Sequence, residues 1–220
     1  MNIDQFAAST ALALLWGGAS VAAPACTDGA FFNPESPMAA CTLIWQAHGK
    51  DFRLDYTPAA NAAPMQWVVT GAAVQTLPFN DPEFQVPPTL ADLDEDGWPD
   101  LWRYLGTGNV NSSFEIFHFN PDRRAFVSLG ELGGVDIFRD QDGMIVASAR
   151  ESCCAWGVAR YRLTGDRLVP QFGLRIESGE TDADPVGCAV FSIDQDPLGR
   201  PAEPLSIAEI PVLTRQHCTP

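Results

Sequence analysis

The run Asp92-Leu-Asp-Glu-Asp-Gly-Trp-Pro-Asp100 constrains the fold of this chain more than any other stretch. Its carboxylates recur at positions 92, 94 and 96, and this much negative charge in one turn is repulsive unless a cation neutralises it. Oxygen ligands at loop positions 1, 3 and 5, a glycine at 6 and a backbone carbonyl at 7 describe a calcium loop. Trp98 would supply that carbonyl, and Asp100 would close the loop from position 9. The sequence therefore predicts a Ca²⁺ site formed by Asp92, Asp94, Asp96, Trp98 and Asp100.

The residues after this loop indicate that it leads into a β-strand. An EF-hand closes its loop with a glutamate at position 12, where this chain has Arg103. Pro99 disfavours the α region for Trp98, and the residues at 101–105, Leu-Trp-Arg-Tyr-Leu, read as strand formers. The simpler alternative is a solvated, Asp-rich surface turn, because Asp-Gly is a common turn signal.

Short segments with strand character, separated by turn residues, fill most of the chain. We expect strands at 38–47, 51–57, 64–77, 101–105, 113–120, 125–129, 144–149, 161–163, 167–169 and 188–194, an extended connection at 78–89 and a loop-rich stretch at 130–138. Both faces of 113–120 carry apolar residues, which predicts a central strand with His118 as a core or rim residue. The fold predicted is all-β, propeller-like or a sandwich of short antiparallel strands with one DxDxDGxxD calcium loop.

The start of the chain reads as a secretory signal. Residues 6–23 form an apolar core followed by small residues, and Ala23-Pro24-Ala25 fits a cleavage site before Cys26. The alternatives are a buried N-terminal helix or an outer-membrane lipoprotein anchored at Cys26. The resulting division is a signal peptide at 1–25, an N-terminal β region at 26–89, a calcium-binding β region continuous with it at 90–195, and a Pro-rich tail at 196–220. No membrane span is expected.

Six cysteines lie after the predicted cleavage site, an even number that indicates disulfides in an exported protein. They are Cys26, Cys41, Cys153, Cys154, Cys188 and Cys218. Sequence order favours Cys26–Cys41 and Cys188–Cys218, with a vicinal Cys153–Cys154 bridge or other partners for that pair. Six cysteines allow 15 connectivities, so other pairings stay open.

The net charge of the chain limits the kinds of molecule that we expect it to bind. The formal net charge is −15, with 13 basic residues of which only Lys50 is a lysine. Nucleic acid and anionic membranes are therefore excluded as expected partners, and a basic protein or calcium itself is favoured.

The motif D-L-D-E-D-G-W-P-D-L resembles the calcium loop of FG-GAP/VCBS-type β repeats. Together with FEIFHFNPDRRAF, a strand ending in SAR and YRLTGDRLVP, it is similar to a family of bacterial periplasmic proteins with a single loop of this kind. The resemblance covers about 85 residues, from Asp92 to Glu177. It implies a periplasmic or secreted protein inhibitor, either a lysozyme inhibitor or an immunity protein against a peptidoglycan-hydrolase toxin of type IV secretion.

Two other functions compete with inhibition. No nucleophile elbow or C-x-x-C pair is present, and calcium explains the strongest acidic cluster, so no enzyme activity is predicted. A calcium-dependent carbohydrate-binding or adhesion module is the alternative, with Trp98 and Trp102 as possible stacking faces.

For an inhibitor, the loops at 106–112 and 148–152 offer partner-binding candidates, namely Asn109, Asn111 and Arg150. The cognate hydrolase and the oligomeric state are left undetermined.

Overall fold

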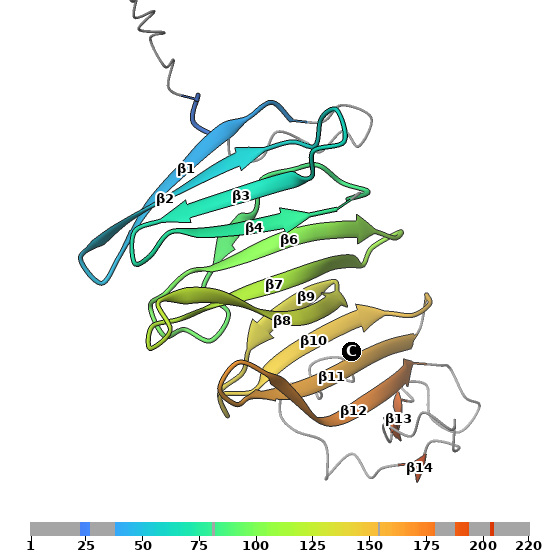
Figure 1. Ribbon diagram of the computed structural model, residues 1–220. Coiled ribbons are helices and arrows are strands. Elements are labelled where there is room, and N and C mark those ends of the chain that lie inside the picture. Colours follow the sequence, from blue (N-terminus) through green and yellow to red (C-terminus); the bar gives the residue numbers. More distant parts are fainter. Residues whose placement is uncertain are drawn as a thin grey trace, which may run out of the picture.

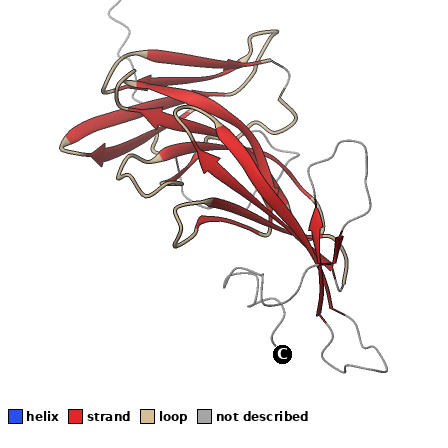
Figure 2. Cartoon of the chain, turned by 90° about the horizontal axis from the view of Figure 1, so that it is seen from below, coloured by secondary structure: helices blue, strands red, loops and turns tan. Residues whose placement is uncertain are grey.

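The computed structural model describes residues 23–26, 38–80, 82–153, 155–178, 188–193 and 203–204. These residues form three antiparallel sheets and contain no helix, so the all-β prediction is confirmed (Figure 2). In Figure 1 the sheets follow one another in chain order, with β1 near one end and β12 near the other. Within the described chain, no helix is long and apolar enough to cross a membrane.

The first sheet is a four-stranded meander in the order β1-β2-β3-β4. Its strands are β1 (Cys41–Ala47), β2 (Lys50–Thr57), β3 (Met65–Thr70) and β4 (Gln75–Phe79). His48 and Gly49 join β1 to β2, and their φ angles of 47° and 71° suit a two-residue hairpin turn. Alternate residues of β2 point inward, so Leu54 and Tyr56 are buried while their neighbours are not.

The second sheet carries the acidic loop. Its strands are β5 (Thr89–Ala91), β6 (Asp100–Thr107), β7 (Ser112–Asn120) and β8 (Ala125–Gly134). On β7, Phe117 and Phe119 join the core shared with the first sheet, whereas Ile116 joins a second core that includes Ile145 of the third sheet. The prediction that this strand is covered on both faces is therefore confirmed.

The third sheet runs in the order β14-β13-β12-β11-β10-β9. Its strands are β9 (Asp136–Arg139), β10 (Ile145–Arg150), β11 (Ala155–Leu163), β12 (Leu168–Ser178), β13 (Cys188–Ile193) and β14 (Glu203–Pro204). The loop-rich stretch expected at 130–138 is wrong, because β8 continues to Gly134 and β9 follows. Pairing with β7 holds this Gly-rich segment extended, and a bulge near Gly130, whose φ is 93°, accommodates it.

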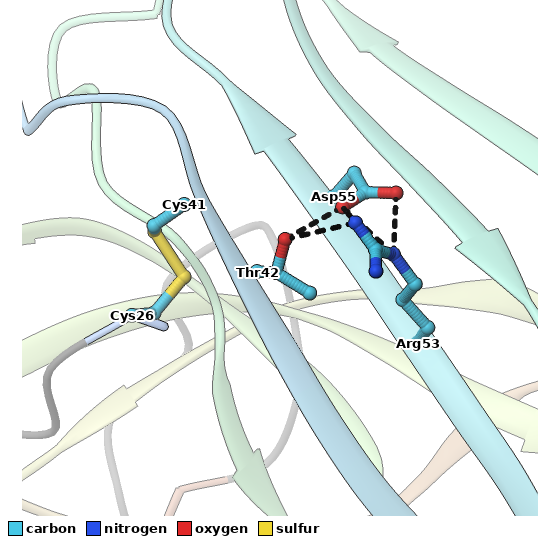
Figure 3. Close-up of a disulfide and its surroundings, with 5 residues drawn as sticks. All are labelled: Cys26, Cys41, Thr42, Arg53 and Asp55. Carbon is cyan, nitrogen blue, oxygen red and sulfur yellow. Dashed lines mark hydrogen bonds and ion pairs between the residues drawn. A yellow bond between two sulfur atoms is a disulfide. The ribbon is translucent and has the colours of Figure 1, made fainter. Parts of the chain in front are cut away.

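A disulfide joins Cys26 to Cys41 at the start of β1, as predicted (Figure 3). Backbone hydrogen bonds pair the same segment with Thr42, whose N–H donates to Pro24 O at 2.8 Å and whose carbonyl accepts from Cys26 N at 2.9 Å. Beside it, the Thr42 hydroxyl donates to Asp55, which also receives the Arg53 guanidinium. Cys154 and Cys218, which the other predicted disulfides require, lie outside the described residues, as do most of the signal peptide and most of the tail.

Candidate metal centre

Residues 92–99 connect β5 to β6, and their own side chains shape the loop. Asp92 accepts the N–H groups of Asp96 and Gly97 at 3.2 and 2.9 Å, and Asp96 accepts that of Trp98 at 2.8 Å. Gly97 has φ 89°, which suits glycine, and a Cβ built there would stand 2.7 Å from His48 Nε2. The turn therefore favours glycine at this position, and a larger residue would also have to displace the His48 ring.

Asp100 is fully buried at the base of the loop. Its Oδ1 accepts from Phe119 N at 3.1 Å and lies 3.0 Å from His118 Nδ1, and its Oδ2 accepts from Leu93 N at 2.9 Å. These contacts fix the carboxylate rigidly. Each carboxylate oxygen has about two lone-pair sites, so Oδ2 retains one that can bind a cation.

Asp94 lies between the other carboxylates with an incomplete set of contacts. Its Oδ1 is buried and has no hydrogen-bond partner among the described residues. Burial raises the pKa of Asp94, and the negative charges of Asp96, Asp100 and Asp92 raise it further, against a lowering effect of His118. A buried carboxylate oxygen without a donor is costly, so this atom is suited to a cation.

His118 is a member of this site that the sequence analysis assigned to the core or rim. It lies on β7 and is only 6% exposed. The pairing of β6 with β7 places it next to Asp100. Burial lowers the pKa of His118, but the hydrogen bond to Asp100 and the charges of Asp100, Asp94 and Asp96 outweigh it, and the pKa is raised. Spacing along the chain gave no signal for this residue.

The potential ligands form two groups that share Asp94. One group adds Asp92 and Asp100, and the other adds Asp96 and His118. In each group one potential ligand atom per residue lies within 4.8 Å of the others. The structure thus brings together all four predicted aspartates, and their oxygens suit a hard cation such as Ca²⁺. The Trp98 carbonyl stays a prediction, because the groups consist of side chains.

The Trp98 indole anchors the loop to its neighbours. Its ring centroid lies 4.2 Å from that of His48 and 4.9 Å from that of Phe119, and Lys50 Nζ lies 5.5 Å from it. On the other side of the loop, Glu95 forms an ion pair with Arg139 of β9 at 3.2 Å. The acidic loop at 92–99 is therefore in contact with all three sheets.

The predicted partner-binding residues lie at the opposite end of β6 from this loop. The Asn111 side chain donates to Arg150 O and accepts from Arg150 N, both at 2.8 Å. The Arg150 guanidinium donates to the carbonyls of Ser152 and Cys153. Asn109 is exposed at the loop tip. The structure thus brings Asn111 and Arg150 together in a contact between sheets.

A second acidic loop, Asp140-Gln-Asp-Gly-Met144, connects β9 to β10. Asp140 is buried and accepts the N–H groups of Asp142 and Met144, both at 2.9 Å. The guanidinium of Arg160, from β11, contacts both carboxylates. Here an arginine of the protein neutralises the acidic pair. Asp140, Asp142 and Gly143 repeat the D-x-D-G spacing of Asp94, Asp96 and Gly97, a signal in the sequence for a related loop.

No protein-family model matches the chain, and no curated protein matches it. Among solved structures, the chain is similar to a Xanthomonas type IV secretion system related protein. The identity is 15%, the match covers 75% of this chain and 93% of the other, and the TM-score is 0.43.

Proposed function

We propose that this chain is an exported calcium-binding β protein that binds and inhibits a basic peptidoglycan hydrolase and catalyses no reaction itself. The observation that carries the calcium part is Asp94 Oδ1, a buried oxygen that has no hydrogen-bond donor among the described residues and lies among three further carboxylates. Bound Ca²⁺ would supply positive charge there and hold the loop in one conformation. Asp92, Asp94, Asp96 and Asp100 would hold it, with the carbonyl of Trp98.

The net charge of −15 supports a basic partner. Glycan-cleaving enzymes that act on an anionic wall polymer are often basic, and opposite charge accelerates their encounter with an acidic protein in a salt-dependent way. The Cys26–Cys41 disulfide supports the exported location, because disulfides persist in oxidising compartments. The resemblance of the acidic loop and its following strands to inhibitors of this class is the third support.

An exposed loop at 107–110 offers a contact surface for such a partner. Gly108 N donates to Asn111 O at 2.8 Å, and Asn111 is bonded to Arg150, so the base of the loop is fixed. The tip residues Asn109 and Val110 are exposed, and Val110 has 46% of its surface accessible. A loop held in one conformation loses little entropy on binding, which favours affinity.

The environment of the two tryptophans favours inhibition over the carbohydrate-binding alternative. Trp98 contacts the rings of His48 and Phe119, and the Trp102 indole N–H donates to Ala91 O at 3.2 Å. Both indoles are partly buried and engaged by the protein. A stacking platform for sugars needs an open aromatic face, so these two side chains are better explained as packing.

The calcium part is tested by thermal unfolding with calcium and with EDTA. Calcium at a hundredfold excess over its Kd raises the free energy of unfolding by about 2.7 kcal/mol. For a chain of this size, that increase raises Tm by about 5–10 °C. EDTA should remove this increment, and Asp96→Ala should abolish the response. Asp122→Ala, which changes an exposed carboxylate in the β7–β8 turn, should leave it intact. An unchanged melting curve in EDTA, with no calcium in the purified protein, refutes calcium binding.

The inhibitor part is tested by the turbidity of a cell-wall suspension with a panel of basic muramidases, using calcium-loaded protein at low salt. At least one enzyme should be inhibited, the inhibition should weaken as salt rises, and Asn109→Ala with Val110→Ala should reduce it. Binding to soluble peptidoglycan fragments without inhibition of any enzyme supports the carbohydrate-binding module instead.

A further inference from the structure

We propose that Asp94, Asp96 and His118 form a mixed oxygen–nitrogen site for Zn²⁺ or a similar transition metal ion. A ring nitrogen of His118 and one carboxylate oxygen from each aspartate lie within 4.8 Å of one another. This site shares Asp94 with the oxygen-only group that contains Asp92 and Asp100. The inference concerns the same loop as the proposed calcium site, but it does not require that calcium binds.

The contact with Asp100 decides which nitrogen of His118 is available. Nδ1 lies 3.0 Å from Asp100 Oδ1, and both oxygens of that carboxylate also accept backbone N–H groups, from Leu93 and Phe119. A carboxylate that serves as acceptor on both oxygens requires the proton to be on Nδ1. In neutral imidazole the lone pair is then on Nε2. Metal-binding histidines usually donate their other N–H to a carboxylate in this manner, which orients the ring.

Burial distinguishes this group from an ordinary acidic surface cluster. His118 is 6% exposed, and its Nδ1 is engaged by Asp100. Asp94 Oδ1 is buried and has no hydrogen-bond donor among the described residues. A buried histidine ring from β7 and an unsatisfied carboxylate oxygen from the loop therefore meet at one place, where a metal ion would satisfy the carboxylate.

The ligand types favour a transition metal at this group. Imidazole suits Zn²⁺ and its neighbours, whereas Ca²⁺ prefers oxygen. Zinc commonly takes three protein ligands and a water, and tetrahedral bonds of about 2.1 Å place ligand atoms about 3.4 Å apart, inside the observed limit. Asp100 would orient His118 without binding the zinc itself. Zn²⁺ and Ca²⁺ would then compete for Asp94 and Asp96, with His118 used only by zinc and Asp92 and Asp100 only by calcium.

Two variants separate the ligand sets. Titration calorimetry of the full chain with ZnCl₂ and with CaCl₂ would compare the wild type, His118→Gln and Asp92→Asn. His118→Gln should weaken Zn²⁺ binding by at least about tenfold and weaken Ca²⁺ binding clearly less, because His118 contacts the calcium ligand Asp100 without binding calcium itself. A cooperative thermal unfolding transition of the variant would show that it folds. Asp92→Asn should weaken Ca²⁺ more than Zn²⁺. The visible bands of bound Co²⁺ should lose their nitrogen-ligand character in His118→Gln.

The outcomes are distinct for the two proposals. Zinc binding by the wild type without calcium binding supports the mixed site and refutes the calcium site. Equal zinc affinity in the wild type and His118→Gln, or no zinc binding by the wild type, overturns the mixed site. A His118→Gln variant that loses both ions equally also overturns it, because His118 would then act only by holding Asp100.

Discussion

Arg160→Met is expected to destabilise the protein strongly, because it removes the cation from a buried acidic loop. The side chains of Arg160 and Asp140 are 8% and 0% exposed, respectively. Removing one partner from a buried ion pair leaves an uncompensated charge, at a cost of about 3–5 kcal/mol. Asp142 lies 3.0 Å from the same guanidinium but is 76% exposed, so water replaces that contact and its loss adds little.

For a chain of this size, 1 kcal/mol corresponds to a Tm shift of about 2–4 °C, so the expected loss is about 6–20 °C. The assay is thermal or urea unfolding in EDTA, so that metal bound at 92–100 does not contribute. Arg162→Met is the matched control, because Arg162 lies on the same strand with an exposed side chain, and its effect should stay within about 0.5 kcal/mol.

A double variant tests the cause of the loss. Asp140→Asn keeps an oxygen acceptor for the N–H groups of Asp142 and Met144 but removes the charge. Arg160→Met with Asp140→Asn should therefore be more stable than Arg160→Met alone. The reasoning is refuted if Arg160→Met unfolds at the wild-type temperature, or if the double variant loses the full sum of the two single effects.

Three further changes have defined outcomes. Ala62 has φ 66° in the β2–β3 turn, so Ala62→Gly should raise stability by about 1 kcal/mol, and an unchanged urea midpoint would contradict the strain. Burial raises the pKa of Tyr56 to about 12, so the neutral form is favoured in the fold and stability should fall as pH rises from about 10 to about 12. Tyr56→Phe should abolish this part of the alkaline loss of stability, and it also removes a buried hydroxyl that has no partner in the described part of the chain. Unfolding midpoints measured at about pH 10 and about pH 12 would show whether the loss disappears. The Cys26–Cys41 disulfide joins residues 15 apart, so replacing both cysteines with serine should cost about 3 kcal/mol in urea unfolding, and equal stability would show that the link constrains the unfolded chain little.

Features that depend on neighbours in the chain could be predicted from the sequence alone. The loop at 92–99 turns on Gly97 and on Asp92, which bonds to N–H groups only four and five residues away. The hairpin at 48–49 and the apolar faces of β7 follow from local turn preference and a two-residue period. These signals depend on little else in the fold, and the four aspartates were identified as one group for that reason.

Contacts that depend on strand register and sheet stacking were decided only by the tertiary structure. His118 reaches the acidic loop because Leu101 pairs with Phe117, which places the next residue of β7 beside Asp100. Arg160 reaches Asp140 across 20 residues of sequence. Register is set by the packing of whole faces and not by the residues that happen to meet, so a histidine and an arginine far from either loop carried no local sign of their roles.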